Sequence, residues 1–224
     1  MPRTVIEIKG LVKRYDGREP ILNGISFSVG EKDFVVICGP SGCGKTTLLN
    51  ILGGLDRPTS GAVEIDGIDV AGLDEDELAR IRLDTIGFVF QDFNLLADLT
   101  VRENVALPLR FSRKRNDGRV DSLLERFGIV HIADEQANRI SGGEAQRAAI
   151  VRAMVNEPRI ILADEPTGNL DNDNTAKVIE TFRVVREDFN TTVVLATHDN
   201  DLVKYATTRI FLDGGEVSIS SIVP

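Results

Sequence analysis

The stretch "FVVICGPSGCGKTTLLNILGG" (34–54) decides the fold of this 224-residue chain. Its first five residues are all apolar, which is typical of a strand that is buried on both faces of a sheet. The glycine-rich segment that follows cannot continue the strand, and "TTLLNILGG" (46–54) has the apolar spacing of a helix. The sequence therefore predicts a buried strand, a tight loop and a helix in direct succession.

The loop fits the pattern G-x-x-x-x-G-K-[ST], which is typical of loops that bind phosphate groups. Its glycines let backbone N–H groups point inward, and the start of the helix adds positive potential. Lys45 would reach the β- and γ-phosphates of a nucleotide, and Thr46 would offer its hydroxyl to Mg²⁺. The alternative is an ordinary glycine turn, which the strand, the Lys-Thr pair and the helix together disfavour. The expected nucleotide-binding residues of the loop are Gly39, Ser41, Gly42, Cys43, Gly44, Lys45, Thr46 and Thr47.

Buried strands are also predicted on the C-terminal side of the loop. "RIILA" (159–163) and "TTVVLA" (191–196) are continuous apolar runs, and "RIFLD" (209–213) is a shorter one. Helical patterns such as "NTAKVIETFRVVRED" (174–188) lie between them. Because buried strands alternate with helices, the core is predicted to be a parallel α/β sheet.

Two other regions complete the predicted fold. The first thirty residues alternate between apolar and polar, as short antiparallel strands do. Between about residues 92 and 157, the helix patterns "VRENVALPLRF" (101–111) and "RVDSLLERFG" (119–128) replace the buried strands. The predicted fold class is α/β: a P-loop NTPase core with a mainly parallel sheet, an N-terminal antiparallel β subdomain and an inserted helical subdomain. We expect all of 1–224 to form a single domain.

Polar residues stand where three apolar runs end. Asp164 would lie at the carboxyl edge of the sheet, where it could hold magnesium, and the adjacent Glu165 is a candidate general base. A solvated pair of acids is the alternative, and the phosphate loop favours the functional interpretation. Gln91 and His198 follow "IGFVF" and "TTVVLA", so both could face the γ-phosphate. Taken singly, each is more often an ordinary hydrogen-bonded residue at a strand end.

Composition and charge limit the function classes. The net charge is −9 and the isoelectric point is near 4.8, which argues against nucleic acid as a partner. Cys38 and Cys43 have neither the number nor the spacing of a disulfide framework or a zinc site, so we expect a cytoplasmic protein. No apolar run approaches the length of a membrane span, and the chain is not expected to cross a membrane by itself.

"ISGGEAQR" (140–147) combines a good helix start with two glycines. Ser141 and Glu144 have the spacing of a capping box. Gly142 and Gly143, however, each cost the helix about 1 kcal/mol relative to alanine. Something other than helix stability has to account for them.

These motifs in this order resemble the ATP-binding subunits of ABC transporters over essentially the whole chain. Residues 39–47 match the Walker A motif, "ISGGE" the signature, and "IILADE" the Walker B motif. Tyr15 corresponds to the aromatic residue that stacks on adenine, Gln91 to the Q-loop, "NLD" to the D-loop and His198 to the switch histidine. Within the family, "LLNILGGLDRPTSG" resembles the subunits of lipoprotein-release and macrolide-export systems.

The resemblance implies ATP and Mg²⁺ as cofactors and a head-to-tail dimer of two copies with two shared sites. Glu165, His198 and Gln91 are then catalytic, and Thr46, Gln91 and Asp164 hold the metal. The signature of one copy caps the ATP of the other, so the cost of its glycines is offset by ligand binding and not by folding. The implied nucleotide contacts outside the phosphate loop are Tyr15, Ser141, Gly142, Gly143, Glu144 and Asp171.

The implied function is an ATPase subunit that powers a separate membrane-spanning protein, an exporter or a lipoprotein-release system. Such a subunit is cytoplasmic and peripheral on the inner face of the cell membrane. One alternative is an ABC-type ATPase that regulates cell-wall remodelling or cell division without transport. A second, an ATPase that moves nucleic acid, is disfavoured because the chain has one cassette, no heptad run and no metal-ligand cluster.

"FNLLADLT" (93–100) follows Gln91 directly and leaves two interpretations open. Its large apolar side chains could form the core of the helical lobe, or a groove that receives a cytoplasmic helix of the membrane partner. These side chains are Phe93, Leu95, Leu96 and Leu99.

Overall fold

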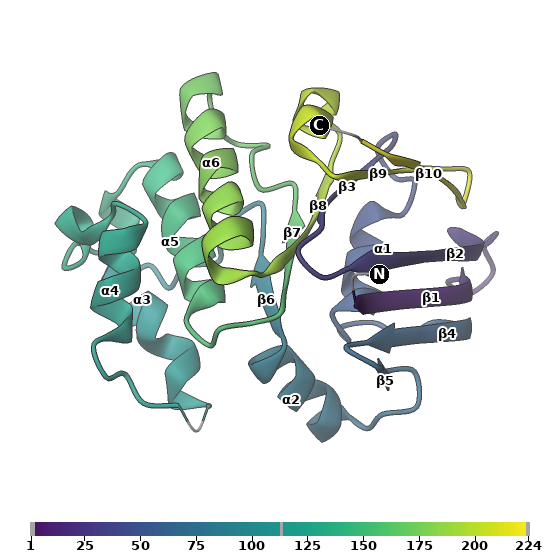
Figure 1. Ribbon diagram of the computed structural model, residues 1–224, viewed down its shortest axis with the longest axis horizontal. Helices are drawn as coiled ribbons and strands as arrows, with labels where there is room; N and C mark the ends of the chain where they lie inside the picture. The colour runs from purple at the N-terminus through teal and green to yellow at the C-terminus, as the bar shows by residue number, and fades with distance from the viewer. Residues whose placement is uncertain (1–2, 113, 223–224) are drawn as a thin grey trace.

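A computed structural model, which describes residues 3–112 and 114–222, divides the strands of that part of the chain between two sheets (Figure 1). The larger sheet has the order β10-β9-β3-β8-β7-β6. All its neighbouring pairs are parallel except β9 and β10, so the predicted mainly parallel sheet is confirmed. Its strands are β3 (Phe34–Cys38), β6 (Ile86–Val89), β7 (Ile160–Asp164), β8 (Thr192–Thr197), β9 (Thr208–Asp213) and β10 (Glu216–Ser221).

The smaller sheet is antiparallel and has the order β2-β1-β4-β5. It confirms the N-terminal antiparallel subdomain, and it lies on the right of Figure 1. Its last two strands could not be predicted, because "SGAVEI" and "ID" are too short and too mixed for a clear alternation. The strands are β1 (Thr4–Lys13), β2 (Leu22–Gly30), β4 (Ser60–Ile65) and β5 (Ile68–Asp69).

Helices α3, α4 and α5 gather beside α6 on the left of Figure 1, and they form the predicted helical subdomain. The expected helix over 101–111 is divided into α3 and a 3₁₀ turn at Pro108, because proline has no N–H to donate to the preceding turn. α2 was not predicted, although Asp74 and Glu77 form a capping box at its start. The α-helices are α1 (Lys45–Leu52), α2 (Glu75–Asp84), α3 (Val101–Ala106), α4 (Arg119–Arg126), α5 (Gly142–Met154) and α6 (Asn172–Phe189). The 3₁₀ helices are η1 (Leu107–Arg110), η2 (Val130–Ile132), η3 (Ala137–Arg139) and η4 (Asn200–Tyr205).

None of the helices in the described ranges combines the length and the apolar character that a membrane span requires.

The two faces of the larger sheet carry separate hydrophobic clusters. On β3, Val35 and Ile37 pack with the smaller sheet and α1, whereas Val36 and Cys38 pack with α5 and α6. All five residues of β3 are buried, as its continuous apolar run predicted. The strand is thus clamped on both sides, and its carboxyl end fixes the position of the loop that follows.

Candidate nucleotide-binding site

The loop between β3 and α1 owes its path to two glycines. A Cβ atom at Gly39 would lie 2.0 Å from the carbonyl oxygen of Leu212, so no other residue fits there without a backbone shift. Gly44, the N-cap of α1, has φ +109°, a left-handed conformation that side chains disfavour. These two glycines of the motif therefore fix the path of the loop without any bound ligand.

Lys45 stands at the mouth of this loop. Its ammonium group donates hydrogen bonds to the carbonyl oxygens of Gly39, at 2.9 Å, and Pro40, at 3.2 Å. It also lies 4.0 Å from the Glu165 carboxylate. The adjoining cavity of about 230 Å³ is lined by Ile21, Ser41, Gly42, Gly44, Lys45, Thr46, Thr47 and Glu165. A largely buried cation beside an open, glycine-rich cavity is suited to bind an anion such as a phosphate.

Asp164, the last residue of β7, provides the oxygen that a cation would need. The pKa of its carboxyl is raised, mainly by burial and to a smaller extent by the charge of Glu165. A hydrogen bond from the Thr46 hydroxyl and the charge of Lys45 act in the opposite direction. One carboxylate oxygen is buried without a hydrogen-bond partner among residues 3–112 and 114–222. An unpartnered carboxylate oxygen next to a threonine hydroxyl fits the oxygen-rich ligand set that Mg²⁺ prefers.

Within those residues, no cluster of three His, Cys, Asp and Glu side chains could hold a metal alone. A magnesium ion here would take its other ligands from phosphate and water, as it does in many phosphate sites.

Glu165 and His198 lie in direct contact. The Nδ1 atom of His198 is 2.9 Å from a carboxylate oxygen of Glu165, and the backbone N–H of His198 donates to the same oxygen at 3.3 Å. Glu165 has φ +45°, a conformation that costs a non-glycine residue about 1–3 kcal/mol. This strained backbone turns the carboxylate toward Lys45 and His198, which brings a predicted base, a predicted sensor and the loop cation together.

We expect His198→Ala to reduce ATP turnover by ~10²-fold or more, the effect typical of groups that position or transfer a proton. The imidazole contacts the carboxylate of the candidate base, so its loss alters the reacting region and leaves the phosphate loop untouched. ATP affinity should therefore barely change. Steady-state turnover and titration with a fluorescent ATP analogue measure the two effects. Turnover near that of the unmodified protein would show that His198 has no catalytic role and is an ordinary hydrogen-bonded residue at a strand end.

Gln91 is hydrogen-bonded to Asn169, a residue for which no role was predicted. Its side-chain amide donates to Asn169 at 3.4 Å, and Asn169 donates to the Gln91 carbonyl at 3.4 Å and to Asp92 at 3.2 Å. A Cβ atom at Gly168 would lie 3.1 Å from the Gln91 amide, so Gln91 covers the turn that begins at Glu165. The sequence signal for Asn169 was its place at the start of "NLD".

Asp171, the residue of that segment with a predicted nucleotide contact, caps α6. Its carboxylate accepts hydrogen bonds from the backbone N–H of Asn174 at 2.8 Å and from the side chain of Asn174 at 3.0 Å. Both of its oxygens are thus used within the chain, and a nucleotide contact for Asp171 stays a prediction.

The predicted capping box at the start of α5 is present. Ser141 accepts a hydrogen bond from the Glu144 N–H, and its own hydroxyl and N–H donate to the Glu144 carboxylate at 2.6 and 2.9 Å. These bonds, the hydroxyl first, lower the pKa of Glu144. Ser141 and Glu144 therefore fix the helix start that carries the two glycines.

The structure explains the two glycines of α5 differently. A Cβ atom at Gly143 would lie 2.4 Å from the side-chain oxygen of Asn174 and 3.1 Å from its Cβ, so a larger residue would have to displace this side chain of α6. Gly143 thus contributes to packing as well, and the ligand contact that the resemblance implies for it stays a prediction. At Gly142 the nearest atoms would be Leu170 at 3.5 Å and Phe93 at 3.7 Å, which are ordinary contacts. Only Gly142 is left without an explanation in the fold of the chain itself.

Tyr15 lies in the turn after β1, which also contributes Ile21 to the phosphate-loop cavity. Its hydroxyl donates to Asp56 at 2.9 Å, and the Lys13 ammonium lies 4.7 Å from the ring centroid. The side chain is nevertheless 42% exposed. The aromatic ring predicted to stack on adenine is thus anchored at its polar end and open to solvent.

The structure brings together Lys45, Thr46, Asp164, Glu165 and His198, but it does not bring the signature to this group. α5, which begins with the signature glycines, belongs to the helical lobe on the left of Figure 1, and α1 lies in the right half. A phosphate bound at the loop would therefore not meet the signature of the same chain.

A groove lies on the other side of the Gln91 segment. It has a volume of about 370 Å³, and its apolar wall comes mainly from Phe88, Phe90, Leu107 and Pro108. Arg152 of α5 lines it and donates to the carbonyl oxygens of Phe93, at 2.8 Å, and Asn94. No sequence signal predicts these contacts, because they cross almost sixty residues.

The side chains expected to form such a groove do not line it. Leu95 packs against the core of the helical lobe, and Leu96 is 49% exposed outside the groove. The position of Leu95 fits the first interpretation, the core of the helical lobe, and a docking role for the exposed Leu96 stays a prediction.

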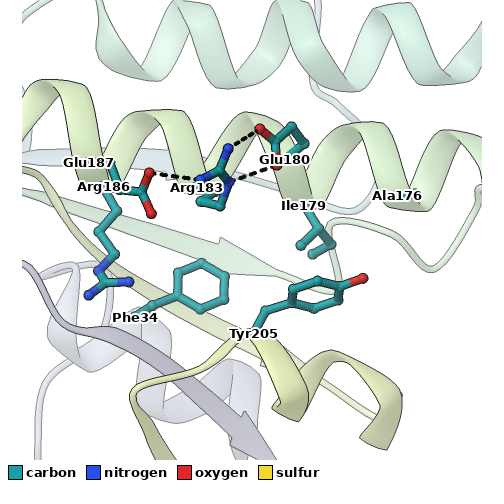
Figure 2. Close-up of a pocket in the computed structure, with 8 residues that line it drawn as sticks. All are labelled: Phe34, Ala176, Ile179, Glu180, Arg183, Arg186, Glu187 and Tyr205. Atoms are coloured by element: carbon teal, nitrogen blue, oxygen red, sulfur yellow. Dashed lines mark hydrogen bonds and ion pairs between the residues drawn. The ribbon is translucent and has the colours of Figure 1, made fainter. Parts of the chain in front are cut away.

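A third cavity, of about 170 Å³, lies at the opposite end of β3 from the phosphate loop (Figure 2). Phe34 and Tyr205 form its aromatic side, and on α6 Arg183 is paired with Glu180 and Glu187. None of the predicted site residues lines it, so it is separate from the nucleotide site.

The site agrees with three comparisons with known proteins. Residues 22–168 match the family model described as ABC transporter. The chain is 44% identical over 223 residues to an uncharacterized ABC transporter ATP-binding protein, MJ0796 of Methanocaldococcus jannaschii, with 95% of each chain covered. It is 42% identical over 225 residues to the macrolide export ATP-binding/permease protein MacB of Syntrophobacter fumaroxidans. That match covers 97% of this chain and 32% of MacB.

A solved structure described as a dimeric, post-hydrolysis state of the MJ0796 cassette bound to ADP and Pi has a TM-score of 0.88 to this chain. The two are 41% identical, with 98% of this chain and 99% of that chain covered. With the phosphate loop, the Asp164–Glu165 strand end and the signature helix all in place, these matches show that the chain belongs to the ABC transporter family as one of its ATP-hydrolysing cassettes.

Proposed function

We propose that the chain powers an export system as a pair of identical subunits bound to the cytoplasmic face of a membrane protein. The relative MacB is named as both an ATP-binding protein and a permease, and this chain matches about a third of it. The matching third fits the ATP-binding part of such a system. In this proposal a separate chain supplies the membrane-spanning part.

The two copies would meet head to tail and share two ATP molecules. The helix after the phosphate loop, α1, and the helix that begins with the signature, α5, lie in different halves of Figure 1, and the exposed Ser141 and Gly142 lie at a helix start that favours anions. The MJ0796 cassette, described as dimeric, provides a precedent. In this arrangement the signature of one copy closes the site of the other.

Each site would use its residues in distinct roles. Lys45 exchanges the carbonyl oxygens of Gly39 and Pro40 for phosphate oxygens, and Glu165 accepts the proton of the attacking water. His198 holds the Glu165 carboxylate in position through the 2.9 Å contact. Thr46, Asp164 and Gln91 would hold Mg²⁺, which neutralises phosphate charge when bound.

We propose that the membrane protein binds in the groove beside the Gln91 segment. Its wall is apolar, it is open at the surface, and Arg152 ties its floor to the loop that follows Gln91. An apolar helix seated there would press on that loop. Movement of the membrane protein would thus reach the catalytic glutamine through one short segment.

We expect Leu107→Glu to weaken binding of the chain to vesicles from its native membrane by about tenfold or more, because a charge in an apolar interface is costly. ATP hydrolysis in solution should stay near normal, since Leu107 lines the groove and not the phosphate-loop cavity. Cosedimentation with vesicles and an ATPase assay measure the two effects.

Leu96→Glu is the matched control, because Leu96 is a half-exposed leucine outside the groove. It should bind vesicles as the unmodified chain does. Undiminished binding of the Leu107 variant, or an equal loss in both variants, would refute the groove as the docking site.

A further inference from the structure

Gln146 of α5 is a buried amide that the fold leaves unsatisfied. The residue is 0% exposed, and neither its side-chain nitrogen nor its oxygen has a hydrogen-bond partner in the described part of the chain. Leaving both a donor and an acceptor without partners inside a protein is costly, and native structures rarely retain such groups without a use.

Asn104 shows that this fold can satisfy a buried amide. It is also 0% exposed, yet its oxygen accepts from Leu96 N–H at 2.7 Å and its nitrogen donates to three carbonyl oxygens, of Leu96, Leu99 and Thr100. The lack of hydrogen-bond partners at Gln146 is therefore specific to its surroundings and not general to this fold.

Those surroundings are the start of the signature helix. Gln146 stands four residues after Gly142 and three after Gly143, so all three share one face of α5. Long helical side chains extend toward the N-terminus, which directs the amide under the two glycines. The atoms nearest to the glycines on that face belong to Phe93, Leu170 and Asn174. An amide directed there would lie near the loop after Gln91, which provides Phe93, and the turn before α6, which provides Leu170.

The turn before α6 is tied to the Gln91 segment by long side-chain hydrogen bonds. The hydrogen bonds that tie Asn169 to Gln91 and Asp92 measure 3.2 to 3.4 Å, at the long end of the range for such bonds. This turn also provides Leu170, the nearest neighbour of the Gly142 position. A small movement toward α5 would bring its backbone groups to the Gln146 amide.

We propose that Gln146 is a positioning residue of the shared ATP site, whose amide gains backbone partners from residues 167–170 when two copies close on ATP. The proposal rests on the head-to-tail dimer proposed above. An amide that is unsatisfied in the open state and satisfied in the closed state favours closure by the difference between the two states. It would also hold the turn next to Glu165 in its closed position.

Gln146→Met tests this, because methionine keeps the length, the flexibility and the helix propensity of glutamine without its polar atoms. In the nucleotide-free protein the variant should melt at a temperature about 2–4 °C higher, since two unsatisfied groups are removed. In the Glu165→Gln background, the ATP-dependent dimer should dissociate at least tenfold more readily. ATP affinity of the monomer should be unchanged.

The opposite signs of the two effects distinguish positioning from simple packing. A lower melting temperature would show that the amide is already satisfied in the open state, for example by an internal water, and would overturn the proposal. Unchanged dimerisation would also overturn it. If Glu165→Gln alone fails to dimerise with ATP, the proposed dimer fails first, and the role of Gln146 fails with it.

Discussion

Lys45→Ala is expected to abolish detectable ATP binding while the protein stays folded. Lys45 is the only cationic side chain between Gly39 and Thr47, and its side chain is only 7% exposed. Charged hydrogen bonds contribute about 1.5–3 kcal/mol each, so losing the ammonium from two phosphates should weaken binding by about 10²-fold or more. Equilibrium titration with a fluorescent ATP analogue measures the loss.

Folding is the control for this variant. The partners that Lys45 leaves behind, the carbonyl oxygens of Gly39 and Pro40, line a loop that is open to water, so stability should change little. Thermal unfolding and circular dichroism check this. A folded Lys45→Ala protein with unchanged affinity for ATP would contradict the assignment of the loop.

The parts of the fold that could be predicted are those with a strong local pattern. β3 and β8 are continuous apolar runs because both of their faces are buried, and the phosphate loop is a contiguous motif. β4 and β5 carry no such pattern, since β5 has two residues and β4 includes a glycine. The helix expected over 101–111 ended early because of Pro108, a breaker whose effect could have been predicted.

The candidate site also has parts that could be predicted from the sequence and parts that could not. Asp164 and His198 could be predicted because parallel strands bring their carboxyl ends to one edge of a sheet. The partnership of Gln91 with Asn169 crosses 78 residues, and that of Arg152 with Phe93 crosses 59. Packing decides these contacts, and local pattern does not encode packing. The same is true of the packing of Gly143 against Asn174 on α6.

Gly142→Asp should separate ATP binding from dimerisation. In the Glu165→Gln background, which removes the base and traps ATP, the chain should form a stable dimer with Mg-ATP and remain largely monomeric without it. Aspartate at Gly142 places a negative charge against the γ-phosphate of the partner's ATP, and like charges at an interface cost several kcal/mol. The dimer should therefore weaken by more than ~10²-fold. ATP binding to the chain's own Lys45 loop should remain nearly intact.

The effect cannot come from unfolding, because an aspartate in the first turn favours a helix and the Gly142 position has room for a Cβ. Gly143→Asp is the contrasting variant: it collides with Asn174, so it should lower the melting temperature of the monomer itself. Light scattering with and without Mg-ATP, together with nucleotide titration on the same samples, makes the comparison. Should Gly142→Asp dimerise as well as its parent, Gly142 has no role in the shared site. The signature would then not close the partner's site, since the glycine least needed for folding would have no role in it.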